Sequence, residues 1–184
     1  MDLLEAILLT VRAAKGHISG RTAIQKLVYF ESVKNIISTE YRPHYYGPYS
    51  ADVASTVQNL VALKFLVEEE VGYADQKNHW KVYRYVLTVE GKKAAEMLIK
   101  KNRGEYKEIE GIVKTCKRVV NLEPNTLSWA AKAYYIISKG GRAMTCEEIK
   151  ADAEGFGWKI PGNVNIDNAV NLLDELGLCA TCTA

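Results

Sequence analysis

The sequence lacks an apolar run long enough to cross a bilayer, and its N-terminus lacks the features of a signal peptide. The longest uncharged stretch there covers only residues 6–11, and the acidic residues Asp2 and Glu5 precede it. We therefore expect a cytoplasmic protein. Its four cysteines should then be reduced thiols rather than disulfides.

A large excess of one charge is also missing. Lysine and arginine number 24 against 22 acidic residues, which gives a net charge of +2. A protein that holds many phosphate groups is usually more basic than this. The sum does not exclude nucleic-acid binding, because the distribution of charge matters more than its total.

The motifs of common enzymes are missing as well. There is no Gly-x-Ser-x-Gly turn for a serine nucleophile, and Gly140-Gly141 leads into Arg142 without the lysine and hydroxyl of a phosphate loop. The acidic pair Glu147-Glu148 is explained by the start of a helix, where negative charge is favourable. We expect no enzymatic activity and no cofactor.

A metal site has weak support. Cys179 and Cys182 have the spacing of metal ligands, but a structural zinc site needs four ligands. Cys116 and Cys146 lie far from them and from each other. The three histidines are scattered at positions 17, 44 and 79. We predict that the chain holds no metal.

Helices and a hairpin follow one another in the first ninety residues. Apolar periodicity predicts helices over residues 3–14, 21–37 and 51–64, then strands over 65–71 and 80–87. The segment 38–49 connects the second and third helices, and residues 41–46 could supply a first strand of the sheet. Within it, Gly47 and Pro48 turn the chain and Ser50 caps the next helix. This order predicts a winged helix-turn-helix with a β-hairpin wing.

The rest of the chain is predicted to be helical, so the overall class is mostly α (α+β). Thr88 caps a helix over 92–122, with Gly91 relieving crowding at its start and Gly104 and Gly111 as breaks or bends. Its apolar stripe consists of Ile109, Ile112, Val113, Cys116, Val119 and Val120. Pro124 marks a boundary between domains 1–122 and 123–184.

The second region is predicted to contain three helices. Thr145 and Glu148 form a capping box, and Asn165 caps the last helix. The stripe Val57, Leu60, Leu63, Phe65 matches Val170, Leu173, Leu176, Leu178 at a constant offset. This weak repeat makes a second, truncated winged-helix-like unit one interpretation of the C-terminal region.

Two motifs carry a family resemblance. Lys26-Leu27-Val28-Tyr29-Phe30 and Tyr46-Gly47-Pro48-Tyr49-Ser50, in this order, resemble the Panacea-domain family of antitoxin-like proteins and their uncharacterised winged-helix relatives in bacteria and archaea. The resemblance covers roughly the first ninety residues. It implies a small winged-helix protein without enzymatic chemistry, and a toxin-like protein as one class of partner.

Duplex DNA is the first candidate partner, for a transcriptional regulator. A winged helix places its third helix in the major groove and its wing on the backbone. Side chains on the third helix would read bases, namely Ser55, Gln58 and Asn59. Phosphate contacts would come from Arg42, His44, Lys64, Lys77, His79 and Lys81. Fold analogy favours this interpretation, but the acidic hairpin opposes it.

A protein partner is the alternative. Tyr45, Tyr46 and Tyr49, close to Tyr41, form an aromatic cluster that suits a protein interface. A simpler explanation is that they pack the turn against the second helix. A homodimer through the 109–120 stripe would double the DNA contacts, although that stripe could equally pack onto its own chain.

Overall fold

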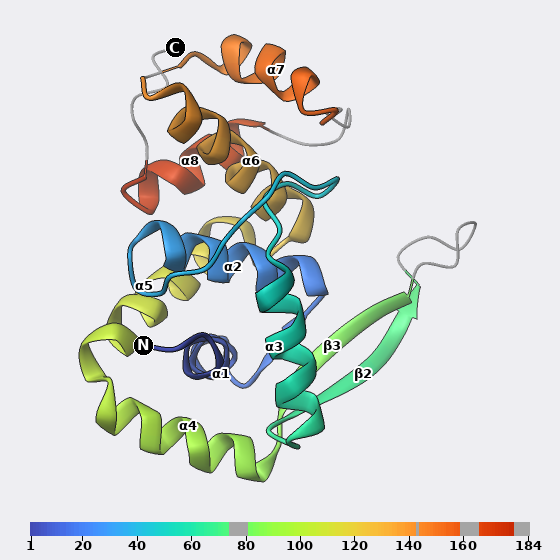
Figure 1. Ribbon diagram of the computed structural model, residues 1–184, viewed down its shortest axis with the longest axis vertical. Helices are drawn as coiled ribbons and strands as arrows, with labels where there is room; N and C mark the ends of the chain where they lie inside the picture. Colours follow the sequence, from blue (N-terminus) through green and yellow to red (C-terminus); the bar gives the residue numbers. More distant parts are fainter. Residues whose placement is uncertain (74–80, 143, 159–165, 179–184) are drawn as a thin grey trace.

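The computed structural model describes residues 1–73, 81–142, 144–158 and 166–178, and these residues form a mostly helical fold with one small sheet (Figure 1). The helices α1–α4 are Leu3–Ala13, Arg21–Val33, Ala51–Ala62 and Val89–Lys101. The helices α5–α8 are Arg103–Val120, Pro124–Gly140, Cys146–Gly155 and Ile166–Glu175. The prediction of a mostly α (α+β) fold with a hairpin wing is confirmed.

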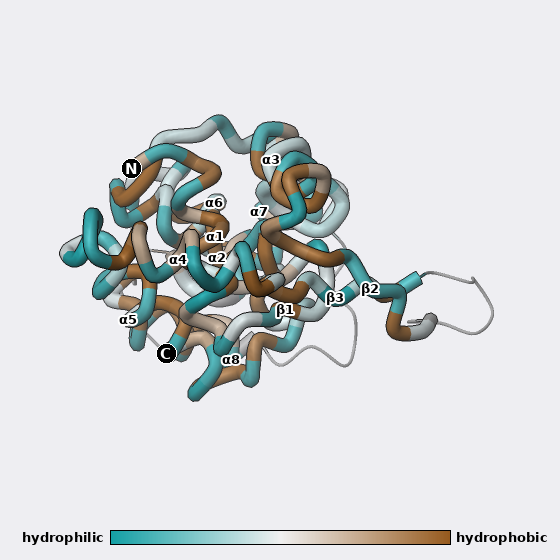
Figure 2. Tube along the Cα trace, turned by 90° about the horizontal axis from the view of Figure 1, so that it is seen from below, coloured by the Kyte–Doolittle hydropathy of each residue, from teal (hydrophilic) through white to brown (hydrophobic). Residues whose placement is uncertain are grey.

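The sheet contains three antiparallel strands in the order β1-β3-β2. They are His17–Ser19, Leu66–Tyr73 and Lys81–Leu87 in chain order. The first strand therefore comes from the loop between α1 and α2, and its prediction at residues 41–46 was wrong. Arg42 forms only an isolated bridge with Tyr49. The hairpin of β2 and β3 projects from the helical body as a wing (Figure 2).

The helix-turn-helix consists of α1, α2 and α3, packed around an apolar core. Ser50 caps α3 as predicted, its hydroxyl accepting a hydrogen bond from the amide of Val53. Helix α2 ends at Val33 rather than residue 37, because Asn35 adopts a left-handed conformation with φ of 60°. Lys64 turns the chain in the same way after α3, with φ of 61°.

The helical segment after the wing is divided at Asn102. Thr88 caps α4 as predicted, accepting from the amide of Gly91 at 2.9 Å. Gly104 and Gly111 were predicted as breaks or bends, but both lie within α5. The break instead falls at Asn102, whose φ of −121° and ψ of 53° lie outside the helical region.

The C-terminal helices pack onto the helix-turn-helix. Helix α6 contacts α2, α8 packs on both α5 and α6, and α7 packs on α6. The stripe of α5 is buried within this chain at Ile109, Ile112, Val113 and Cys116, so these side chains are not available as a dimer surface. The Leu-rich repeat is imperfect, because Leu176 is buried whereas Leu63 is 57% exposed. None of the described helices is long and apolar enough to span a membrane.

Candidate functional site

A tight turn places two tyrosines at the surface. The amide of His44 donates to the carbonyl of Gly47 at 3.2 Å, and the amide of Gly47 donates back at 2.8 Å. Gly47 has a φ of 86°, a conformation that glycine adopts without strain. Tyr45 and Tyr46 occupy the tip, where their side chains are 69% and 37% exposed. We refer to residues 44–47 as the tyrosine turn.

Helix α2 anchors the segment that follows this turn. The side-chain amide of Gln25 donates to the carbonyl of Ser50 at 2.9 Å, and the Ser50 amide donates to Gln25 Oε1 at 3.1 Å. The buried Lys26 Nζ donates to the carbonyl of Pro48 at 2.5 Å. Buried side chains of α2 therefore fix the backbone of Pro48 and Ser50 in place.

The C-terminal region anchors the turn from the other side. Ser128 Oγ on α6 donates to the carbonyl of Tyr46, and Trp158 Nε1 donates to the carbonyl of His44, both at 2.7 Å. The side chain of Lys132 packs against Gly47, and its ammonium lies 4.5 Å from the centre of the Trp129 ring. Sequence reasoning missed Ser128, Lys132 and Trp158, because nothing local marks a contact across more than eighty residues.

Two buried lysines lie beside this turn. Within the described residues, neither has a carboxylate among its hydrogen-bond or ring contacts. Burial, together with the nearby charge of Lys132, lowers the pKa of Lys26 to about 7. Burial also lowers the pKa of Lys132 to about 8. Both amines are therefore partly neutral near physiological pH, which reduces the cost of keeping them inside the protein.

Replacing Gly47 by alanine should loosen the tyrosine turn. A Cβ atom would lie 2.8 Å from Lys132 Cγ and 3.3 Å from the carbonyl oxygen of Ser128, and the left-handed backbone adds strain. We expect the free energy of unfolding to fall by roughly 1–3 kcal/mol. Urea unfolding followed by circular dichroism measures this. Alanine at Gly141, where φ is 64° but no atom lies within 4 Å, isolates the backbone contribution. Equal losses in the two variants would contradict the packing argument.

A groove of about 910 Å³ adjoins the tyrosine turn. Its walls come from the start of α2, the turn, strand β3 and the start of α6. Tyr45, Tyr46 and Tyr83 provide aromatic surface, and the Arg21 guanidinium lies 4.3 Å from the centre of the Tyr83 ring. Tyr49 lies outside this groove. The simpler packing explanation fits Tyr41, whose ring meets that of Tyr29 on α2 edge-on at 4.9 Å.

The predicted base readers lie together on α3, and all three are exposed. Ser55 Oγ donates to the carbonyl of Asp52 at 3.0 Å, and Gln58 hydrogen-bonds the carboxylate of Glu68. Two readers therefore already have partners within the chain. Lys64 is exposed just beyond the helix, while Lys77 and His79 lie outside the described residues.

The three glutamates on the described part of the hairpin each pair with a cation. Glu68 pairs with Arg21 at 3.0 Å, Glu70 with Lys81 at 2.8 Å, and Glu69 with Arg84 at 3.6 Å. Burial alone would raise the pKa of Glu68, but hydrogen bonds from Tyr85 and Arg21 hold it below its ordinary value. The predicted phosphate contact Lys81 is thus engaged within the wing.

The remaining predicted site residues do not join the α3 surface. Arg42 lies 3.8 Å from Glu40, and the ring of His44 packs 5.0 Å from that of Tyr49. His44 begins the tyrosine turn, and Arg42 lies two residues before it. The cysteines Cys179 and Cys182 lie outside the described residues.

Comparison with known proteins adds a relative but no function. A scan of protein-family models found no match. The chain is 33% identical over 87 residues to the uncharacterized protein YwgA of Bacillus subtilis. That alignment covers 47% of this chain and spans half the length of YwgA.

Proposed function

We propose that this protein is an interaction module that binds a partner protein through the tyrosine turn and the adjoining groove. The observation that carries this proposal is the exposure of Tyr45 and Tyr46 on a turn that is hydrogen-bonded from two sides. Tyrosine contributes large contact area together with a hydroxyl, and it is enriched among the residues that dominate binding energy.

Rigidity of the turn supports the same role. Bonds from Ser128 and Trp158 hold its backbone before any partner arrives, and Lys26 holds the adjoining carbonyl of Pro48. A preordered surface loses less conformational entropy on binding than a loose loop does. The resemblance of the first ninety residues to antitoxin-like proteins points to a protein partner as well.

A DNA-binding regulator is the second candidate. The exposure of Ser55, Gln58 and Asn59 on the third helix favours it, as does the projecting wing. The ion pairs of Arg21, Lys81 and Arg84 with the hairpin glutamates weigh against it. Each such cation would have to leave a carboxylate before it could neutralise a phosphate.

Site-specific photo-crosslinking tests the proposal. A benzophenone amino acid replaces Tyr45 in one variant and Met97 in another. Met97 is a matched control because it is 71% exposed on α4, which lies far from the tyrosine turn (Figure 1). In cells of the source organism, we expect one protein to be crosslinked from position 45 and not from position 97. Tyr46→Ala should weaken that adduct by about tenfold.

Two results would contradict this expectation. Adducts of equal yield from both positions would mean non-specific contact. Saturable binding to random duplex DNA in the micromolar range, lost steeply as salt rises, would instead support the regulator. The DNA titration uses the purified chain, with fluorescence anisotropy as the readout.

A further inference from the structure

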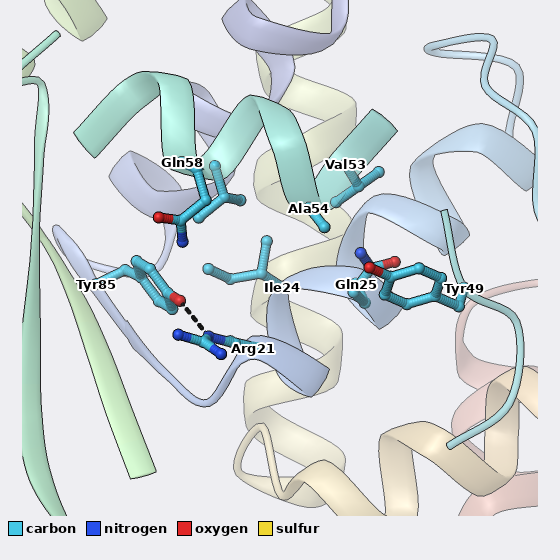
Figure 3. A pocket seen from close by; sticks show the side chains of 9 residues that line it. Arg21, Ile24, Gln25, Tyr49, Val53, Ala54, Gln58 and Tyr85 are labelled. Atoms are coloured by element: carbon cyan, nitrogen blue, oxygen red, sulfur yellow. Dashed lines mark hydrogen bonds between the residues drawn. The ribbon is translucent and has the colours of Figure 1, made fainter. Parts of the chain in front are cut away.

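A second hollow lies on the other side of Arg21, between α2, α3 and β3 (Figure 3). Its volume is about 300 Å³, which falls at the lower end of the range for small-molecule sites. Its middle is apolar, with Ile24 from α2 and Val53, Ala54 and Val57 from α3. None of these side chains offers a hydrogen bond, so this section suits a hydrocarbon or aromatic body.

Polar groups gather at one end of this pocket. Arg21 Nε donates to the Tyr85 hydroxyl at 2.9 Å, and that hydroxyl donates to Glu68. Gln58 hydrogen-bonds Glu68 from the α3 side. A side-chain amide carries both donors and an acceptor, so Gln58 can bond a ligand while it contacts Glu68.

The opposite end is also polar. Gln25 uses its side-chain amide on the backbone of Ser50, and Tyr49, which also lines the pocket, carries a hydroxyl group. In Figure 3 the side chains of Tyr49 and Gln25 lie at one end of the pocket, and those of Tyr85 and Arg21 lie at the other. An occupant thus meets an apolar middle between two hydrogen-bonding ends.

Charge restricts the occupant further. Arg21 is the cation that lines this pocket, and Glu68 neutralises it at 3.0 Å. A ligand carboxylate would be attracted by the Arg21 guanidinium but repelled by the Glu68 carboxylate beside it. The site therefore offers an anion little net attraction. A neutral ligand avoids this repulsion.

We propose that this pocket binds a small neutral molecule with a flat apolar body and a carboxamide or hydroxyl group directed toward Gln58. The site is separate from the partner groove, which Tyr45 and Tyr46 line. Because Val53, Ala54, Val57 and Gln58 all belong to α3, the ligand contacts the third helix of the winged helix directly.

Chemical-shift titration of the purified, isotope-labelled chain tests this site, with indole-3-acetamide as the neutral probe and indole-3-acetate as its charged analogue. We expect saturable shifts at Val57, Gln58 and Tyr85 with a dissociation constant in the micromolar to low millimolar range. The acetate should bind at least about fivefold more weakly, because its carboxylate faces Glu68.

Variants on one helix provide the control. Ala54→Phe fills the pocket and should weaken amide binding by about tenfold or more, whereas Ala62→Phe places the same ring on an exposed position of α3 and should leave binding unchanged. If Ala54→Phe unfolds the protein, Ala54→Leu is used in its place, because leucine fills the pocket with less added volume. Absence of saturable binding, equal binding of both probes, or binding unaffected by both Ala54 variants would overturn the proposal.

Discussion

Replacing Gly91 by alanine is expected to lower the free energy of unfolding by about 2–4 kcal/mol. A Cβ atom on Gly91 would lie 2.0 Å from the carbonyl oxygen of Phe65 and 3.0 Å from its carbonyl carbon. These are backbone atoms, so no side-chain rotation can relieve the clash. The Phe65 carbonyl accepts a hydrogen bond from the amide of Thr88 at 3.1 Å. The Phe65 amide donates to the carbonyl of Leu60 at 2.9 Å, so the backbone of Phe65 is held on both sides. Helix α4 would have to move away from the start of β2.

Gly111→Ala is the matched control for this variant. Gly111 is exposed within α5, and an added Cβ would meet nothing within 4 Å. Alanine there should stabilise the protein by about 0.5–1 kcal/mol, because glycine is the poorer helix former. Urea unfolding of both variants, followed by circular dichroism, gives the two free energies. A loss at Gly91 no larger than 1 kcal/mol would show that the contact with Phe65 is easily relaxed.

Local signals account for the features that sequence reasoning predicted well. The caps at Ser50, Thr88 and Thr145 each depend on a hydroxyl that reaches an amide three residues away, so the sequence alone contains the whole interaction. The crowding at Gly91 was also predicted from its place after the wing. Strand β1 was not, because three residues carry no periodic pattern and the strand exists only through pairing with β3.

Long-range contacts decide the candidate site, and there the sequence was less informative. The turn at Gly47 and the tyrosines were visible, but their anchors Ser128 and Trp158 come from the far end of the chain. The sequence shows which charged residues the hairpin contains, but not which of them form ion pairs with one another. The register of β2 on β3 places Glu69 opposite Arg84, while Arg21 reaches Glu68 from another element.

A buried carboxyl group leads to the second large expected effect. Glu31 on α2 is fully buried, and its Oε1 accepts from the Thr10 hydroxyl of α1 at 2.7 Å. Within the described residues, Glu31 Oε2 and the nearby Tyr41 hydroxyl have no hydrogen-bond partner. Burial raises the pKa of Glu31 to about 8, although the bond from Thr10 opposes this. The folded protein therefore holds Glu31 in its neutral form at pH 7.

Glu31→Gln should remove a pH dependence of stability. In the unfolded chain this carboxyl has a pKa near 4.5, so between pH 4.5 and 8 the folded state binds the extra proton. The free energy of unfolding is then highest below pH 4.5 and falls as pH rises toward 8, by at most about 5 kcal/mol. Glutamine is neutral at every pH and can still accept from Thr10. We expect the variant to be more stable than the wild type at pH 8 by roughly 2–4 kcal/mol, and about equal to it at pH 4.5.

Lys26 provides a control of opposite sign on the same helix. Its pKa of about 7 lies below the value of 10.5 for a free lysine, so the unfolded state binds the extra proton between these values. Stability from Lys26 therefore increases as pH rises from 7 to 10.5, and Lys26→Met should remove that increase. Unfolding free energies measured from pH 4.5 to 10 separate the two groups, because Glu31 alone gives a falling slope below pH 7, Lys26 gives a rising slope above pH 8, and each variant removes only its own slope. If Glu31→Gln kept the decline between pH 5 and 8, the proton would belong to another group, and the buried carboxyl would be charged in the folded state.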